Sequence, residues 1–277
     1  MDITSELESL SIEQAALLET LLDEAAEGPP PSLKPMAAAV LEGNRPLFVV
    51  HGSGGRTFFL HALARCLLMP NGLSGIEAVE QDAAIPAEPG CDLYLEVLRQ
   101  VQPRGPYRVG GYSAGCLIAF EMAVRLQAMG ETVEFVLLID PVSVPKRDVR
   151  PRNASTPSER LRRRFEIASL TGITPLAREF SYVAQVDRIL TAITRDFRPG
   201  LFVGCIHLIH GRRGGYALTP QALEAWAALT TDGLQCATLD CDHFEIVREP
   251  HISATAGHIR QWLDGLESAN SFAAPHG

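Results

Sequence analysis

The sequence lacks the features of a membrane, secreted or metal-binding protein. Its longest apolar runs, such as FVLLI at 135–139, are far shorter than the roughly 20 residues that a membrane-spanning helix needs. The N-terminus has no basic residues ahead of an apolar segment, so it does not resemble a secretory signal. The six cysteines include no CxxC pair, which disfavours a metal site or a disulfide framework and predicts reduced thiols in the cytoplasm.

Positive charge is also scarce at the start of the chain. Residues 1–28 hold eight acidic residues and no Lys or Arg, while the 277-residue chain has a net charge of −9. The remaining residues therefore carry a net charge of −1, which disfavours nucleic-acid binding. The composition, 46% hydrophobic and 21% charged, is that of a globular protein long enough to bury a core without disulfides or metals.

The chain divides into four predicted parts: an acidic N-terminal segment, a Pro-rich linker, a main domain and a flexible tail, at 1–28, 29–44, 45–268 and 269–277. Within the first part, Ser11 and Gln14 have the spacing of a capping box, and apolar residues then recur every three or four positions, which predicts an amphipathic helix. Three roles stay open for this helix: a clamp on its own domain, a homodimer contact, or a docking element for another protein.

Strands and helices alternate in the predicted main domain. Apolar strands are expected at 46–50, 107–112, 133–140, 204–211 and 234–240, and helices at 58–67, 114–130 and 251–266. Strands that are apolar along their whole length are typical of a mostly parallel sheet with helices on both faces, so the predicted fold class is α/β. A stretch rich in Pro and Arg interrupts the pattern, and we interpret about 145–200 as a helical lid inserted over the sheet.

A serine lies between two glycines in the motif GYSAG, at 111–115. Ser113 could be only a small residue in a glycine-rich turn, but a predicted strand runs directly into the motif and a predicted helix runs out of it. This context favours a nucleophile elbow. The helix N-terminus would direct the amide of Ala114 at a developing oxyanion. A second amide, from Ser53, is expected in the glycine-rich turn HGSGG, where His51 is expected to shape the turn.

A nucleophilic serine needs a base that is oriented by a carboxylate. In this architecture the chain order is serine, acid, histidine. Asp140 ends the strand after the elbow helix, and His243 lies in a loop after the last predicted strand. Asp140 has an alternative role as a turn residue or helix cap, and Asp240 and Asp242 compete with it as the acid. Neighbouring side chains in an extended loop point apart, which disfavours Asp242.

Three segments resemble the thioesterase domains that end non-ribosomal peptide synthetase and polyketide synthase lines. They are PLFVVHGSGG, GPYRVGGYSAGCLIAFEMAVRLQAMGETVEFVLLIDP and DCDHFEIV, and the resemblance covers about residues 45–265. It implies an α/β-hydrolase fold with a mobile lid. It also implies that the serine takes an acyl chain from the phosphopantetheine arm of a carrier protein, so that no bound cofactor is expected.

The resemblance also implies roles for individual residues. Ser113, Asp140 and His243 match the family's catalytic triad, and Ala114 and Ser53 match its oxyanion positions. One departure is that the first turn lacks the proline that many relatives have after the aromatic residue or histidine. A second is that nothing upstream resembles a carrier domain, which leaves a discrete enzyme acting in trans or an excised terminal domain.

The position of the acid separates two subclasses of these domains. Proofreading (type II) members usually carry it in the loop after the next-to-last strand, but here that loop, HGRRGGYALTP at 210–220, has no acid. A releasing (type I) enzyme that hydrolyses or cyclises its acyl chain is therefore favoured. The alternatives are a proofreading thioesterase, a general esterase and, disfavoured by the intact triad, a non-catalytic carrier-binding scaffold.

Basic residues gather in the first part of the predicted lid, where residues 146–164 hold eight of the 24 Lys and Arg residues of the chain. They form either a solvated face or a contact for an acidic carrier protein or the phosphate of its arm. The members singled out for this contact are Arg162, Arg163 and Arg164.

Overall fold

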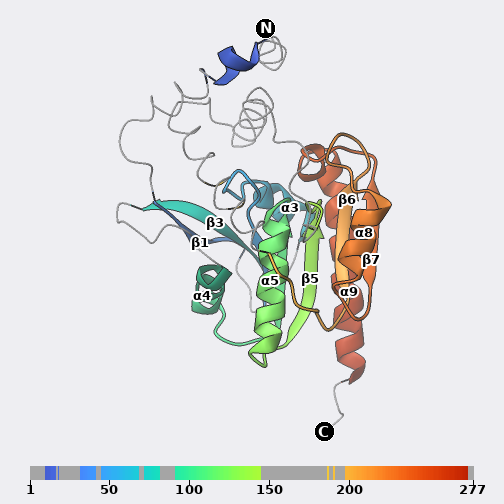
Figure 1. Cartoon of the computed structure of the whole chain (residues 1–277). Coiled ribbons are helices and arrows are strands. Elements are labelled where there is room, and N and C mark those ends of the chain that lie inside the picture. The colour runs from blue at the N-terminus through green and yellow to red at the C-terminus, as the bar shows by residue number, and fades with distance from the viewer. Residues whose placement is uncertain are drawn as a thin grey trace.

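A seven-stranded sheet runs through the centre of the protein (Figure 1). The structure, a computed structural model, describes residues 10–16, 18, 32–41, 45–68, 72–81, 91–144, 186, 190 and 197–273. The named elements are β1 (Ser32–Leu41), β2 (Leu47–Val50), α3 (Phe59–Leu67), β3 (Leu73–Gln81), α4 (Cys91–Val101), β4 (Tyr107–Tyr112), α5 (Gly115–Ala128), β5 (Val133–Ile139), β6 (Ile206–Gly211), α8 (Pro220–Ala227), β7 (Leu234–Leu239), the 3₁₀ turn η1 (Glu245–Val247) and α9 (His251–Ala273).

The sheet has the strand order β1-β3-β2-β4-β5-β6-β7. The six strands from β3 to β7 are parallel, and β1 pairs antiparallel with β3 at the edge. The predicted mostly parallel sheet is therefore confirmed. Because all six parallel strands point the same way, the loops that follow β2, β4, β5, β6 and β7 gather at one edge, and this is where ligands bind in such sheets.

Strand β1 corrects one prediction, because it lies within the segment 29–44 that was expected to be a linker. Its sequence, SLKPMAAAVL, contains a proline and three alanines, residues with low strand propensity. A proline is tolerated here because β1 is an edge strand, where one side of the ladder needs no partner. Strand β3 and helix α4 also lie in a region for which no element was predicted.

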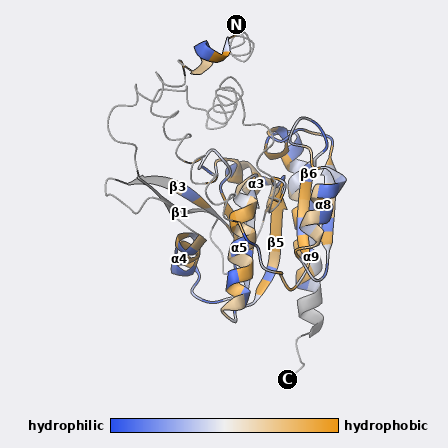
Figure 2. Ribbon diagram, in the orientation of Figure 1, coloured by the Kyte–Doolittle hydropathy of each residue, from blue (hydrophilic) through white to orange (hydrophobic). Residues whose placement is uncertain are grey.

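Helices cover both faces of the sheet, and each face has its own apolar cluster. Helices α3 and α9 pack on one face against residues such as Val49 and Leu137. Helices α4 and α5, together with Trp226 of α8, pack on the other face against residues such as Phe48 and Leu138. Strand β5 is hydrophobic along most of its length (Figure 2), as expected for a strand buried on both sides.

The turn between β4 and α5 is too crowded for side chains at its two glycines. A Cβ on Gly111 would lie 2.4 Å from the carbonyl oxygen of Gly115, and a Cβ on Gly115 would lie 2.1 Å from the carbonyl oxygen of His51. Between them, Ser113 has the left-handed φ of 57°, which non-glycine residues seldom adopt. The glycines therefore let α5 start directly against the turn that follows β2.

The predicted capping box and the end of α5 both have the hydrogen bonds of helix caps. The amide of Glu131 bonds the carbonyl of Leu126 and that of Gly130 bonds Gln127, which is a Schellman motif with glycine in the left-handed region. In the N-terminal segment, Ser11 and Gln14 bond each other's amides with their side chains, as a capping box does.

Other predictions fall partly or wholly outside the described residues. Of the N-terminal segment the structure describes residues 10–16 and 18, and the three roles of its helix stay predictions. Of the lid at 145–200 it describes residues 186, 190 and 197–200. At the C-terminus, α9 continues to Ala273, so the predicted tail begins as helix, because no glycine or proline interrupts residues 266–273. Among the described helices, none has the length and apolar character that crossing a membrane requires.

The close approach at Gly115 predicts a large effect of one methyl group. Gly115→Ala should lower the free energy of unfolding by about 2–3 kcal/mol, because the new Cβ meets a backbone oxygen that cannot move aside. Gly257→Ala on α9 is the matched control, since a Cβ there meets nothing within 4 Å. It should raise stability by about 0.5–1 kcal/mol. Urea unfolding measures both, and equal effects would contradict the packing described here.

Candidate functional site

Ser113 lies at the junction of β4 and α5, at the carboxyl edge of the sheet. Its amide donates to the carbonyl of Ile139 at 2.9 Å, which fixes the turn against the end of β5. The residue is 6% exposed. The next residue, Ala114, immediately precedes α5, so its amide is at a helix N-terminus, where backbone N–H groups have no partner within the helix.

Asp140 and His243 form a buried pair at the same edge. Nδ1 of His243 lies 2.5 Å from Oδ2 of Asp140, and the second carboxylate oxygen accepts the amide of Gly211 at 2.8 Å. The amide of Asp140 itself donates to Ile209 at 2.7 Å. Asp140 is 2% exposed and His243 6%. Both oxygens of the buried carboxylate are thus hydrogen-bonded, as a buried charge requires.

The two competing acids do not contact the ring of His243. Oδ1 of Asp242 accepts the amides of Phe244 and Glu245 at 2.8 and 2.9 Å, and so caps η1. Asp240 pairs with Arg212 at 3.0 Å on the surface. The expectation that Asp140, rather than either of these, faces the histidine agrees with this geometry.

Aromatic rings surround the imidazole of His243. Tyr112 stacks on it with ring centroids 5.1 Å apart, and its hydroxyl donates to the carbonyl of His243 at 2.8 Å. Tyr216 stacks with centroids 4.6 Å apart, and Phe244 meets the ring edge-on at 5.1 Å. Because Tyr112 precedes Ser113 in the chain, its contacts bring the histidine loop to the elbow.

The turn after β2 lies against the elbow. A Cβ on Gly52 would be 3.4 Å from Cβ of Ser113, and Ser53 is buried, with 7% exposed. The ring of His51 is held between the carbonyl of Gly52 at 2.7 Å and the hydroxyl of Tyr94 at 2.8 Å. Complete burial lowers the pKa of His51 to about 4. His51 is thus a neutral histidine that shapes this turn, as expected.

Comparison with known proteins adds to this geometry. The family model that describes the thioesterase domain matches residues 45–263, most of the chain. The chain belongs to the thioesterase domain family. Enzymes of this family are hydrolases, and the buried pair of Asp140 and His243 fits such an activity.

Curated relatives of this thioesterase domain are much longer proteins. It is 28% identical over 283 residues to the chondramide synthase cmdD of Chondromyces crocatus, covering 83% of this chain and 7% of that protein. It is 36% identical over 105 residues to the microperfuranone synthase of Emericella nidulans, covering 35% of this chain and 11% of that protein. The chain therefore spans a small fraction of the length of the relatives it matches.

Solved thioesterase domains share the fold. The NocB thioesterase domain, in covalent complex with a fluorophosphonate analogue of nocardicin G, superposes with a TM-score of 0.63 at 26% identity, over 79% of this chain and 95% of that one. The surfactin thioesterase domain SrfTE superposes with a TM-score of 0.62 at 18% identity, over 83% and 95% of the two chains. The α/β-hydrolase fold is therefore confirmed.

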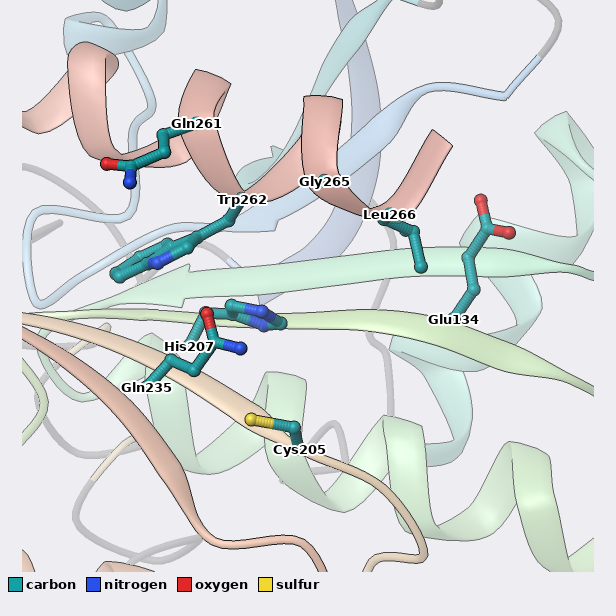
Figure 3. A pocket seen from close by; sticks show the side chains of 8 residues that line it. All are labelled: Glu134, Cys205, His207, Gln235, Gln261, Trp262, Gly265 and Leu266. Atoms are coloured by element: carbon teal, nitrogen blue, oxygen red, sulfur yellow. The ribbon is translucent and has the colours of Figure 1, made fainter. Parts of the chain in front are cut away.

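The thioesterase domain also has a cavity at the opposite end of its sheet (Figure 3). Its volume is about 540 Å³, and it lies between α9 and the starts of β5, β6 and β7. The ring of His207 lines it, stacked on Phe135 at 4.4 Å and next to Trp262 at 5.1 Å. Burial lowers the pKa of His207 to about 4. None of the candidate catalytic residues lines this cavity.

Sequence reasoning missed the contacts that Tyr112 and Tyr216 make. Tyr112 is the variable residue between the glycine and serine of the motif, and no rule gives it a role. Tyr216 lies in the loop after β6, which ends at the same edge as the elbow, so its position could have been inferred from topology.

The residues Arg162, Arg163 and Arg164 lie outside the described residues, and their contact with a carrier stays a prediction.

The lowered pKa of His51 predicts a pH dependence of stability. Because the folded pKa is about 4 and the usual value about 6.5, protons bind the unfolded chain more tightly between these values. The free energy of unfolding is therefore unaffected by His51 above pH 6.5, where the ring is neutral in both states. It falls as the pH drops from 6.5 toward 4, because the unfolded chain gains the proton first. His51→Asn, which keeps a donor near Gly52, should reduce the loss of unfolding free energy between pH 7 and 5 by about 2 kcal/mol. Urea titrations at both pH values test this, and identical losses in both proteins would refute it.

Proposed function

We propose that this thioesterase domain takes an acyl, peptidyl or polyketide chain from a carrier-protein phosphopantetheine thioester onto Ser113 and releases it by hydrolysis or cyclisation. The buried contact between His243 and Asp140, at the edge of the sheet where the elbow ends, is the observation that carries the proposal. A histidine held through Nδ1 by a carboxylate leaves Nε2 to act as a base.

The proposed reaction has two halves. In the first, Nε2 of His243 takes the proton of the Ser113 hydroxyl as Oγ attacks the thioester carbonyl. The tetrahedral oxyanion is stabilised by the amides of Ala114 and Ser53. The C–S bond then breaks, and the imidazolium returns the proton to the leaving thiolate. In the second half, water or a nucleophile within the acyl chain attacks the ester and gives its proton to Nε2 of His243. The bond between the acyl carbon and Oγ of Ser113 then breaks, and the imidazolium returns the proton to Oγ.

Two observations favour chain release over proofreading. The end of β6 contributes the amide of Gly211 to Asp140, and the loop that follows, where proofreading enzymes usually hold the acid, contains no Asp or Glu. The relatives with matching segments are long synthases, and SrfTE, which shares the fold, cyclises the lipopeptide antibiotic surfactin. Both support a type I domain that acts on a carrier-bound chain.

The partner proposed for the domain is an acyl or peptidyl carrier protein, which delivers the substrate on its own phosphopantetheine arm. No further cofactor is needed for the steps above. We also propose a cytoplasmic location, which the free state of all six cysteines supports. Three of them, Cys91, Cys116 and Cys241, are buried as thiols.

Acyl-enzyme formation tests the proposed function directly. The protein is mixed with acyl thioesters of pantetheine, and its intact mass is followed by mass spectrometry. We expect a mass increase equal to the acyl group, lost again as product is released. Ser113→Ala should show no such increase while keeping its fold by circular dichroism. An acyl adduct on the alanine variant would mean that another residue is the nucleophile.

The acid is tested by two matched substitutions. Asp140→Asn should lower kcat by a factor on the order of 10³–10⁴, because the amide cannot hold the correct tautomer of His243 or stabilise its imidazolium. Asp242→Asn should lower kcat about tenfold or less, since its side chain only caps η1. Steady-state hydrolysis of a small thioester gives both values. If the larger loss came from Asp242, the assignment of the acid would be wrong.

A further inference from the structure

Tyr216 is the exposed member of the aromatic group around His243. Its ring centroid lies 4.6 Å from that of the imidazole, with 26° between the planes, and it meets Phe244 edge-on at 5.8 Å. The residue is 41% exposed, whereas Tyr112, which also stacks on the imidazole, is 5% exposed. Tyr216 therefore stacks on the imidazole from a partly exposed position.

Hydrogen bonds and an ion pair join the loop that carries Tyr216 to the loop that carries His243. The amides of Arg212 and Arg213 donate to Leu239 and Cys241 at 3.0 and 3.1 Å, which continues the ladder between β6 and β7. Arg213 also pairs with Glu245 at 2.7 Å. These contacts hold the two loops, and with them Tyr216 and His243, next to each other.

Glycines bring the two loops close together. Gly214 has a φ of +81°, and a Cβ there would lie 3.4 Å from Cβ of Asp242. The amide of Ala217 then closes a turn on the carbonyl of Gly214 at 3.3 Å, with Tyr216 inside it. The turn directs the tyrosine back toward the histidine loop rather than along the surface.

We propose that Tyr216 is a positioning residue that holds the plane of the His243 imidazole and stabilises the imidazolium formed during catalysis. The inference rests on the proposed role of His243 as the base. The loop after β6 then supplies an aromatic face for the His243 ring, while the end of β6 supplies the amide of Gly211 for Asp140.

The physical reason lies in what the bond to Asp140 leaves undetermined. A hydrogen bond at Nδ1 fixes one point of the ring, but the ring can still swing about that point and move Nε2 away from the serine. Stacked aromatic rings oppose this motion. An aromatic face also attracts a cation placed over it, so its stabilisation of the ring grows when the imidazole gains a proton. Such an interaction lowers the barrier rather than strengthening substrate binding.

Three substitutions separate these effects. Tyr216→Phe keeps the aromatic face, Tyr216→Leu keeps bulk without that face, and Tyr216→Ala removes both. With a small acyl thioester of N-acetylcysteamine, Phe should keep kcat within about threefold. Leu and Ala should lower kcat about tenfold with little change in KM, the size expected from losing one aromatic–cation contact. Melting temperatures should stay close to that of the unsubstituted protein, because the side chain is partly exposed.

A second measurement does not depend on thioester chemistry. A simple alkyl fluorophosphonate reacts when serine Oγ attacks phosphorus, the P–F bond breaks, fluoride leaves and the base takes the serine proton. Its rate of labelling, followed by intact mass, should fall about tenfold in Tyr216→Ala and Tyr216→Leu and stay near the original value in Tyr216→Phe.

The outcomes distinguish this inference from the proposed function. If the unsubstituted protein formed no acyl adduct with a thioester, the proposed function would fail, while the labelling rates would still decide the role of Tyr216. Unchanged labelling in Tyr216→Ala would overturn the inference. A higher KM at unchanged kcat would also overturn it, since Tyr216 would then be a wall of the substrate site. Full activity in Tyr216→Leu would show that the aromatic face has no role and would equally refute the proposal.

Discussion

The buried carboxylate of Asp140 joins the ends of three neighbouring strands. It follows β5, accepts the amide of Gly211 at the end of β6, and bonds the ring of His243 in the loop after β7. A carboxylate with 2% of its surface exposed is costly unless each oxygen finds a donor. The loops at this edge must therefore be arranged so that both oxygens of the carboxylate are hydrogen-bonded. The pairing of Ile139 with Ile209 sets the register of β5 and β6 in which the amide of Gly211 reaches Asp140.

The second constraint is steric and acts on the backbone. Gly111 and Gly115 let β4, α5 and the turn after β2 approach within distances that no Cβ would permit. The result is a serine on a strained turn, next to the N-terminus of a helix and against a second glycine-rich turn. Amides from both segments can then point at one oxygen. The oxyanion site proposed for Ala114 and Ser53 thus depends on this close packing of the backbone.

Much of this could be predicted because the decisive signals are local. The strands at 107–112 and 133–139 are buried along most of their length, and glycines flank the serine where a strand runs directly into a helix. The pairing of Asp140 with His243, 103 positions apart in the chain, followed from the rule that parallel strands end at one edge of the sheet. Strand β1 could not be predicted, because its alanines and proline give no periodic signal and its pairing with β3 is a tertiary contact. The stacking of Tyr112 and Tyr216 was missed for the same reason: ring contacts depend on how loops fold back, which no local pattern encodes.

Comparison of three histidines, His51, His207 and His243, shows why the last of them suits catalysis. His51 bonds a carbonyl and a tyrosine hydroxyl. His207 stacks on Phe135 and lies next to Trp262. Burial lowers the pKa of both histidines to about 4. Each is therefore held neutral, which suits a structural role. Among the described residues, His243 is the histidine whose ring is bonded to a buried carboxylate. That carboxylate compensates the positive charge that a base acquires when it takes a proton. His243 is buried together with its anionic partner, so the low dielectric around the pair strengthens the attraction between imidazolium and carboxylate.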